Sequence, residues 1–186
     1  MIPKRPGVFM DRDGVLSRNV VRDGEPCSPR LAKDFEIFPD LEKQLAELSG
    51  AGYYLFAVTN QPDISRGGMA SSELEAMHLK LMASLGPHGL RKIYVCPHDD
   101  RDQCRCRKPK PGMILEAAAE WNIDLVQSFM IGDRLTDISA GRQAGCRTIL
   151  IQANPGDAPQ SDYTARDLPD ACRMILALTK SKPEKP

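Results

Sequence analysis

Apolar and polar positions alternate along the chain in two distinct patterns. Short apolar runs rich in aromatic and β-branched residues are typical of buried strands, and longer segments with apolar residues three or four positions apart are typical of helices. The expected strands are residues 7–10, 53–58, 92–95, 128–133 and 147–151. The expected helices are residues 41–50, 72–85 with Ser72 as its N-cap, 111–123, 137–145 and 168–180. This alternation predicts an α/β fold whose mostly parallel sheet is covered on both faces.

Polar side chains gather directly after the apolar runs. Ligands of parallel sheets bind beyond the carboxyl ends of the strands, so we expect the residues that follow each run to share one rim. This set comprises Asp11, Asp13, Thr59, Asn60, Gln61, the Cys/His segment 96–106, Lys108 and Asp133.

Three of these residues are acids. A lone D-x-D such as Asp11 and Asp13 is more often surface decoration than a site, but here it follows a buried strand and Asp133 follows another. Three carboxylates on one rim repel each other unless a cation lies among them, and oxygen-only ligands suit Mg²⁺. An aspartate can also attack a phosphoryl group and form an aspartyl-phosphate.

The other polar residues of the rim are hydrogen-bond donors. Thr59, Asn60 and Gln61 could donate to phosphate oxygens, although such residues often only bond to their own turn. Lys108 supplies a positive charge, although a lysine without context is usually solvated.

The segment "CPHDDRDQCRC" holds four metal-ligating residues close together: Cys96, His98, Cys104 and Cys106. Four such ligands close a tetrahedral zinc site with no open position, so this zinc is expected to be structural. Disulfides or free thiols are the alternatives. The remaining cysteines, Cys27, Cys146 and Cys172, are expected to be small apolar side chains.

Composition and charge argue against some classes of partner and location. The 186 residues carry 25 basic and 25 acidic side chains, and this balance gives no general attraction to nucleic acid or to an acidic membrane. No apolar run has the length of a membrane span or of a signal peptide. We therefore expect a cytoplasmic, monomeric protein with one domain at 1–178, and a disordered tail at 179–186.

Four motifs together resemble those of the haloacid dehalogenase-like phosphatases. "FMDRDG", "VTNQ", "CRKPKPG" and "MIGDRLTD" stand in that family's order and span most of the chain. With a cysteine-rich loop directly before the lysine, the chain is similar to the zinc-containing group that includes the heptose-bisphosphate and histidinol-phosphate phosphatases. The resemblance implies a Rossmann-like three-layer α/β/α sandwich with a zinc-binding loop and no large cap domain, in which small loops close the site.

The resemblance also implies roles for individual residues. Asp11 would be the nucleophile, and Asp13 the general acid and then the base. Thr59 and Lys108 would hold the transferring phosphoryl group, and Asp133 would bind Mg²⁺ together with Asp11 and the Asp13 backbone, with Asp137 behind the metal. The substrate contacts implied by loop position are Asn19, Val20, Val21, Arg22, Asn60, Gln61, Arg66, Arg107 and Arg134.

A small phosphate monoester is thus the expected substrate. Residues 34–40 and the segment "ISRGG" resemble the heptose enzymes and favour heptose 1,7-bisphosphate, whereas the short spacing between ligands of the zinc loop resembles the histidinol-phosphate enzymes. A phosphotransferase, or a zinc-stabilised interaction module without activity, is a more remote alternative.

Overall fold

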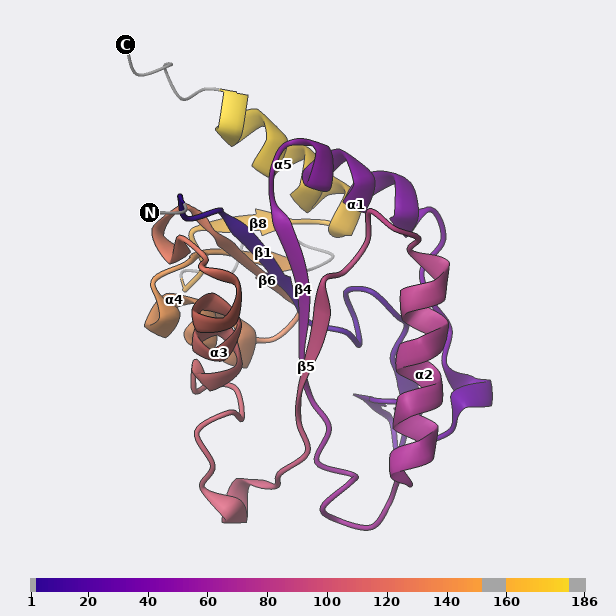
Figure 1. Ribbon diagram of the computed structural model, residues 1–186. Coiled ribbons are helices and arrows are strands. Elements are labelled where there is room, and N and C mark those ends of the chain that lie inside the picture. The colour runs from indigo at the N-terminus through magenta and orange to yellow at the C-terminus, as the bar shows by residue number, and fades with distance from the viewer. Residues whose placement is uncertain (1–2, 152–159, 181–186) are drawn as a thin grey trace.

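Six parallel strands form one central sheet in the computed structural model, which describes residues 3–151 and 160–180 (Figure 1). The strand order is β5-β4-β1-β6-β7-β8. Their bounds are β1 Gly7–Met10, β4 Tyr54–Asn60, β5 Lys92–Cys96, β6 Phe129–Gly132, β7 Arg147–Ile151 and β8 Tyr163–Ala165. β1 lies in the middle of the sheet, where Met10 pairs with Ala57 on one side and with Ile131 on the other.

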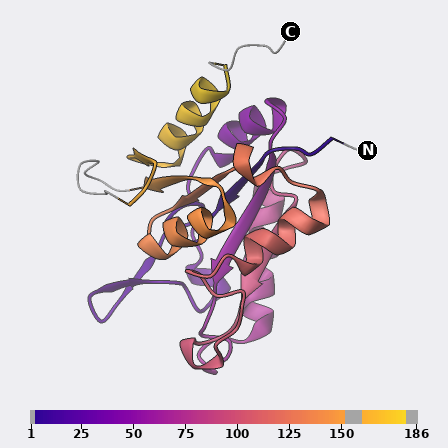
Figure 2. The ribbon, with the colours of Figure 1, turned by 90° about the vertical axis from the view of Figure 1, so that its left-hand side faces the viewer.

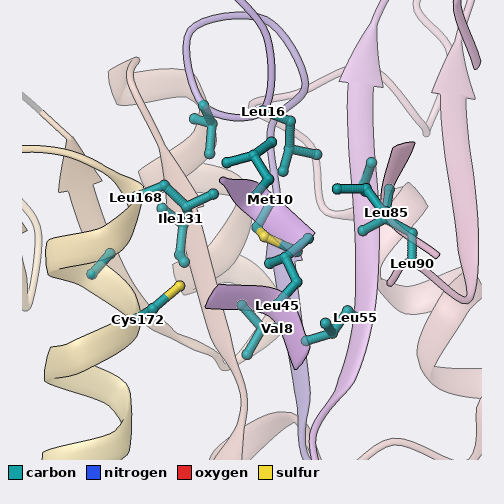
Figure 3. Close-up of a cluster of buried hydrophobic side chains, with 14 of the residues drawn as sticks. Val8, Met10, Leu16, Leu45, Leu55, Leu85, Leu90, Ile131, Leu168 and Cys172 are labelled. Carbon is teal, nitrogen blue, oxygen red and sulfur yellow. The ribbon is translucent and has the colours of Figure 1, made fainter. Parts of the chain in front are cut away.

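Helices cover both faces of this sheet. They are α1 Leu41–Gly50, α2 Ser71–Ser84, α3 Gly112–Trp121, α4 Leu135–Ala144 and α5 Leu168–Lys180. Side chains alternate across a strand, so Val8 and Met10 pack with α1, α2 and α5, whereas Phe9 packs with α3 and α4. Figure 3 shows the first of these two cores, in which Leu45, Leu168 and Cys172 gather around β1. The predicted three-layer Rossmann-like sandwich is confirmed.

The element boundaries differ from the predictions at several points. α2 begins at Ser71 after Ala70, which makes no side-chain cap, so the prediction of Ser72 as N-cap is wrong. α4 begins at Leu135, two residues before the predicted start. α5 runs to Lys180, past the predicted start of the tail, and residues 181–186 lie outside the described residues.

Two features were not predicted, because each strand has only three residues. One is β8, and the other is an antiparallel hairpin of β2 Val20–Arg22 and β3 Glu25–Cys27. Asp23 and Gly24 turn the hairpin with positive φ angles of 54° and 82°. An Asp-Gly pair between short strands is a strong hairpin signal, so the sequence did contain the information. Short 3₁₀ turns occupy Ala32–Asp34, Asp100–Asp102 and Leu125–Gln127.

The carboxyl ends of the strands carry the loops that form the site. The β2–β3 hairpin and the cysteine-rich loop after β5 both extend at this end of the sheet (Figures 1 and 2). The segments after β1 and β4 contain only this hairpin, short turns and one helix each, which agrees with the absence of a large cap domain. Among residues 3–151 and 160–180, no helix has the length and apolar character needed to cross a membrane.

Candidate active site and cysteine-rich loop

A buried lysine lies between two buried acids at the centre of the rim. Lys108 Nζ is 2.9 Å from Asp11 Oδ1 and 2.6 Å from Asp137 Oδ1, and it donates to the Val58 carbonyl at 2.7 Å. Asp11 directly follows β1, Asp137 lies in the first turn of α4, and Lys108 comes from the loop after β5. Chain segments far apart in the sequence therefore meet in one ion-pair cluster.

The electrostatics of this cluster make Asp11 harder to ionise than an exposed aspartate in the metal-free protein. Burial raises the pKa of Asp11 to about 6, against the attraction of Lys108 and with the repulsion of Asp137 and Asp13. Burial opposes the charge on Lys108 as well, but Asp11 and Asp137 more than offset it and raise the pKa of Lys108. The lysine is thus a fixed positive charge beside the proposed nucleophile.

Asp11, Asp133 and Asp137 form a group that could hold a metal ion. One carboxylate oxygen from each lies within 4.8 Å of the others. Burial, followed by repulsion from Asp11, raises the pKa of Asp133 to about 6. Asp133 Oδ1 is buried without a hydrogen-bond partner among the described residues, and a cation would satisfy it. A hard cation such as Mg²⁺ fits this oxygen-only set.

Gly14 allows the close approach that this group needs. It has a φ of +88°, and a Cβ atom there would overlap the Asp133 carboxylate. Asn19, predicted to contact substrate, instead donates to Asp133 Oδ2 at 3.4 Å.

The Asp13 carboxylate accepts hydrogen bonds from three side chains. Arg12 donates to both of its oxygens, Ser17 donates to Oδ1 and Gln61 donates to Oδ2. Burial alone would raise the pKa of Asp13, but the Arg12 charge outweighs it and the pKa is lowered. Arg12 and Ser17 were not predicted as site residues, because the sequence "DRDGVLS" does not reveal which side chains turn inward.

The last two residues of β4 and the residue that follows it support the site. Asn60 and Lys108 exchange two hydrogen bonds, in which Asn60 Nδ2 donates to the Lys108 carbonyl at 3.0 Å and the Lys108 N–H donates to Asn60 Oδ1 at 3.1 Å. The Gln61 amide is engaged with Asp13 and with the Thr59 hydroxyl. Asn60 and Gln61 therefore hold the proposed catalytic groups in place, and Thr59 lies buried beside them.

A cavity of about 670 Å³ opens above Asp11 and Asp13. Arginines from the four segments that follow β1, β4, β5 and β6 line it: Arg22, Arg30, Arg66, Arg107 and Arg134. Four of these were expected substrate contacts, and Arg30 was missed, since only the fold of the hairpin brings it to the cavity.

Aspartates hold several of these arginines. Arg66 pairs with Asp99 at 2.8 Å and Arg107 pairs with Asp100 at 2.6 Å.

Val20 and Val21 do not support the predicted contact with substrate. Arg22 is the residue of strand β2 that lines the cavity, and Val21 beside it is 77% exposed. Alternation along the strand turns Val21 to the face opposite Arg22, whereas Val20, on the same face as Arg22, is not among the residues that line the cavity.

The cysteine-rich loop brings its four predicted ligands into one cluster. Cys106 Sγ is 3.1 Å from Cys96 Sγ, 3.4 Å from Cys104 Sγ and 3.3 Å from His98 Nδ1. Four ligands around Zn²⁺ would lie about 3.3–3.8 Å apart, whereas disulfide sulfurs lie about 2.0 Å apart. All six cysteines are free, so the cluster fits a metal and not a disulfide. Burial opposes ionisation of Cys104, but the Arg107 backbone N–H and the neighbouring thiols lower its pKa to about 7.

Comparisons with known proteins agree on one family of enzymes. The HAD-hydrolase-like family model matches residues 105–171. The D-glycero-β-D-manno-heptose-1,7-bisphosphate 7-phosphatase of Rhodopseudomonas palustris is 35% identical over 77% of this chain and 81% of its own. The enzyme of the same name from Helicobacter pylori strain 26695 is 35% identical over 90% of this chain and 96% of its own.

A solved structure supports the same relationship. The D,D-heptose 1,7-bisphosphate phosphatase of B. bronchiseptica, crystallised with magnesium and phosphate, aligns with a TM-score of 0.79. It is 30% identical, and the alignment covers 93% of this chain and 99% of that one. Identity of this degree across nearly whole chains that share one fold shows that the chain belongs to the haloacid dehalogenase-like phosphatases, within the family of the heptose-1,7-bisphosphate 7-phosphatases.

Proposed function

We propose that this phosphoric monoester hydrolase removes the 7-phosphate of D-glycero-D-manno-heptose 1,7-bisphosphate. The observation that carries the chemistry is the placement of Lys108 Nζ 2.9 Å from Asp11 Oδ1 on the floor of the arginine-lined cavity. A carboxylate beside a fixed cation is suited to attack a phosphoryl group whose developing charge the cation offsets. The relatives named above supply the expectation of a heptose bisphosphate.

Two steps account for hydrolysis. An oxygen of Asp11 attacks the phosphorus atom, the bond from phosphorus to the sugar oxygen breaks, and the leaving alkoxide takes a proton from Asp13. Asp13 then removes a proton from water, which attacks the aspartyl-phosphate and releases phosphate with Asp11 restored. In the free protein Asp13 is ionised, because its pKa is lowered. The negative charge of a bound phosphate would raise this pKa and allow Asp13 to acquire the proton that it donates.

Both metals belong to the proposal. Asp11 and Asp133 are the side chains that would hold Mg²⁺, together with the predicted Asp13 carbonyl, and Asp137 would stand behind the metal, since Lys108 and the Arg134 N–H already engage its two oxygens. When bound, Mg²⁺ neutralises charge on the phosphate oxygens and orients them. Cys96, His98, Cys104 and Cys106 would hold a closed, structural zinc ion. Arg107 and Lys108 directly follow the last of these ligands, so the loop would set where the lysine enters the site.

The cavity favours a bisphosphate over histidinol phosphate. A second phosphate needs positive groups besides Lys108, and Arg22 and Arg134 line the same cavity. Histidinol phosphate carries only one phosphate, so it has no second anionic group for these arginines to bind.

A parallel rate comparison tests the assignment. The purified protein with Mg²⁺ is assayed on heptose 1,7-bisphosphate and on histidinol phosphate, and kcat/KM is compared. We expect a preference for the bisphosphate of at least about 10²-fold. Equal rates, or a preference for histidinol phosphate, would overturn the substrate assignment. Phosphate release by Asp11→Asn at the wild-type rate would overturn the chemistry as well.

A further inference from the structure

A fully buried arginine lies directly behind Asp13. The Arg12 guanidinium donates to Asp13 Oδ1 through Nε at 3.0 Å and to Asp13 Oδ2 through Nη2 at 2.7 Å. Its side chain is 0% exposed, and the guanidinium lies 5.2 Å from the centre of the Phe35 ring. Because this fork grips both carboxylate oxygens, it fixes the plane of the carboxylate as well as its position.

The third guanidinium nitrogen is held from the other side. Arg12 Nη1 lies 3.1 Å from Nε2 of His78, which belongs to α2. A guanidinium has donors only, so His78 Nε2 must be the acceptor, and the imidazole must be neutral with its proton on Nδ1. Burial, followed by repulsion from Arg12, lowers the pKa of His78 to about 4, which agrees with a neutral ring.

These contacts form a row from helix α2 to the active site. His78 holds Arg12, and Arg12 holds Asp13, while Ser17 and Gln61 also donate to the carboxylate. Arg12 itself is too deeply buried to touch a substrate in the cavity. It can therefore influence the reaction only through the placement of Asp13.

We propose that Arg12 is a positioning residue that aims the Asp13 carboxylate at the leaving-group oxygen, and that His78 braces Arg12 from helix α2. This inference rests on the proposed function, in which Asp13 gives a proton to the leaving alkoxide. A misplaced carboxylate would transfer that proton poorly. An error of about 1 Å in the placement of a reacting group can cost on the order of 10²-fold in rate.

Because Asp13 protonates the leaving group, the proposal can be tested by comparing substrates with different leaving groups. An alkoxide is a strong base and needs protonation as it departs, whereas p-nitrophenolate is a weak base and departs with little help. Loss of the correct Asp13 position should therefore lower kcat/KM for an alkyl phosphate much more than for p-nitrophenyl phosphate. A general loss of folded protein would lower both values by the same factor.

The experiment measures kcat/KM for both substrate types with Mg²⁺, in the wild type and in five variants. Arg12→Lys keeps the charge but cannot form the two-oxygen fork. We expect it to lose about 10²-fold on heptose 1,7-bisphosphate and only a few fold on p-nitrophenyl phosphate. Arg18→Lys, an exposed arginine nearby that pairs with Glu36, is the matched control and should keep both rates.

Two substitutions at His78 test separately whether this residue holds Arg12 in place. Gln places a carbonyl oxygen near the position of Nε2, so His78→Gln should keep the ratio of the two rates. His78→Leu removes the acceptor and should shift the ratio in the same direction as Arg12→Lys, by a few fold. If Arg12→Lys does not fold, His78→Leu decides, and an unchanged ratio in that variant overturns the proposal.

Asp13→Asn separates this inference from the function on which it rests. If Asp13→Asn is selective for the alkyl phosphate and folded Arg12→Lys is not, the positioning role is wrong and the proposed mechanism stands. If Asp13→Asn loses both activities equally, the assignment of Asp13 as the acid is wrong, and the role of Arg12 falls with it.

Discussion

Lys108 Nζ lies 2.9 Å from Asp11 Oδ1, which joins the loop after β5 to the end of the central strand β1. Asp137 Oδ1 lies 2.6 Å from the same nitrogen, so one lysine is shared between two buried acids. Removing two carboxylates from water is costly, and the ammonium group that they share offsets that cost. The cluster is thus both the proposed reaction centre and the electrostatic support of the rim.

Replacement of Lys108 should impair turnover and stability together. Lys108→Ala removes the charge that would offset the developing negative charge of the phosphoryl group, and we expect kcat to fall by about 10²–10³-fold. The two acids lose their partner, so the Tm of the metal-free protein should also fall. Steady-state assays and thermal denaturation check this, with the exposed Lys43→Ala as control. Full activity in Lys108→Ala would mean that another cation serves the phosphoryl group.

Replacement of Asp11 should separate turnover from folding. Burial raises the pKa of Asp11 to about 6, so its charge is costly in the metal-free protein and an isosteric amide should be tolerated. We expect Asp11→Asn to lower kcat by at least about 10³-fold, while the Tm without Mg²⁺ stays close to that of the wild type. Asp34→Asn, at an exposed position, should change neither value. Near-normal turnover in Asp11→Asn would remove this residue as the nucleophile.

The effect of Mg²⁺ on stability should depend on pH. Asp11 and Asp133 have pKa values raised from 3.8 to about 6 in the fold. Between these values the folded chain binds more protons than the unfolded chain, so the stability of the metal-free protein should fall as the pH rises from 4 to 6. Mg²⁺ competes with those protons, so its stabilising effect should grow over the same window.

Thermal denaturation with and without Mg²⁺ at about pH 5 and about pH 7.5 measures this difference. We expect Mg²⁺ to raise the Tm by several degrees at the higher pH and by much less at the lower one. Asp133→Asn should remove most of the response. An equal shift at both pH values in the wild type would place the metal elsewhere.

Disruption of the cysteine-rich loop should release zinc and destabilise the protein. Cys104 Sγ lies 3.4 Å from Cys106 Sγ and 3.6 Å from Cys96 Sγ, so Cys104→Ser would leave three ligands. We expect less zinc per chain by elemental analysis and a Tm lower by several degrees. Cys27→Ser, in the hairpin and outside this cluster, should keep the zinc content. An unchanged zinc content in Cys104→Ser would refute the site.

The periodicity of the chain was sufficient for five of the six strands of the sheet and for its helices. Buried strands such as Gly7–Met10 and Arg147–Ile151 carry an apolar signal in consecutive residues, and α5 carries it on one face. Strand β8 has only three residues, and its place beside β7 depends on a pairing that no local pattern encodes.

The site residues that could be predicted from the sequence are those whose position follows from local order and spacing. Asp11, Asp133 and Lys108 could be assigned to one rim from the sequence, because the direction of parallel strands brings their carboxyl ends to one edge. The four ligands of the cysteine-rich loop were recognisable because they lie close together in the chain. The order of residues and the spacing between them can be read directly from a sequence.

The partners of these residues depended on packing between distant segments. Arg12 could have pointed to solvent, and only the positions of β1, α2 and Phe35 place its guanidinium between Asp13 and His78. In the same way, Asn60 was predicted to bind substrate, but the approach of the Lys108 loop engages its amide. Side-chain direction follows from where buried charge can be neutralised and buried donors satisfied, and that requires the neighbours that only the folded chain supplies.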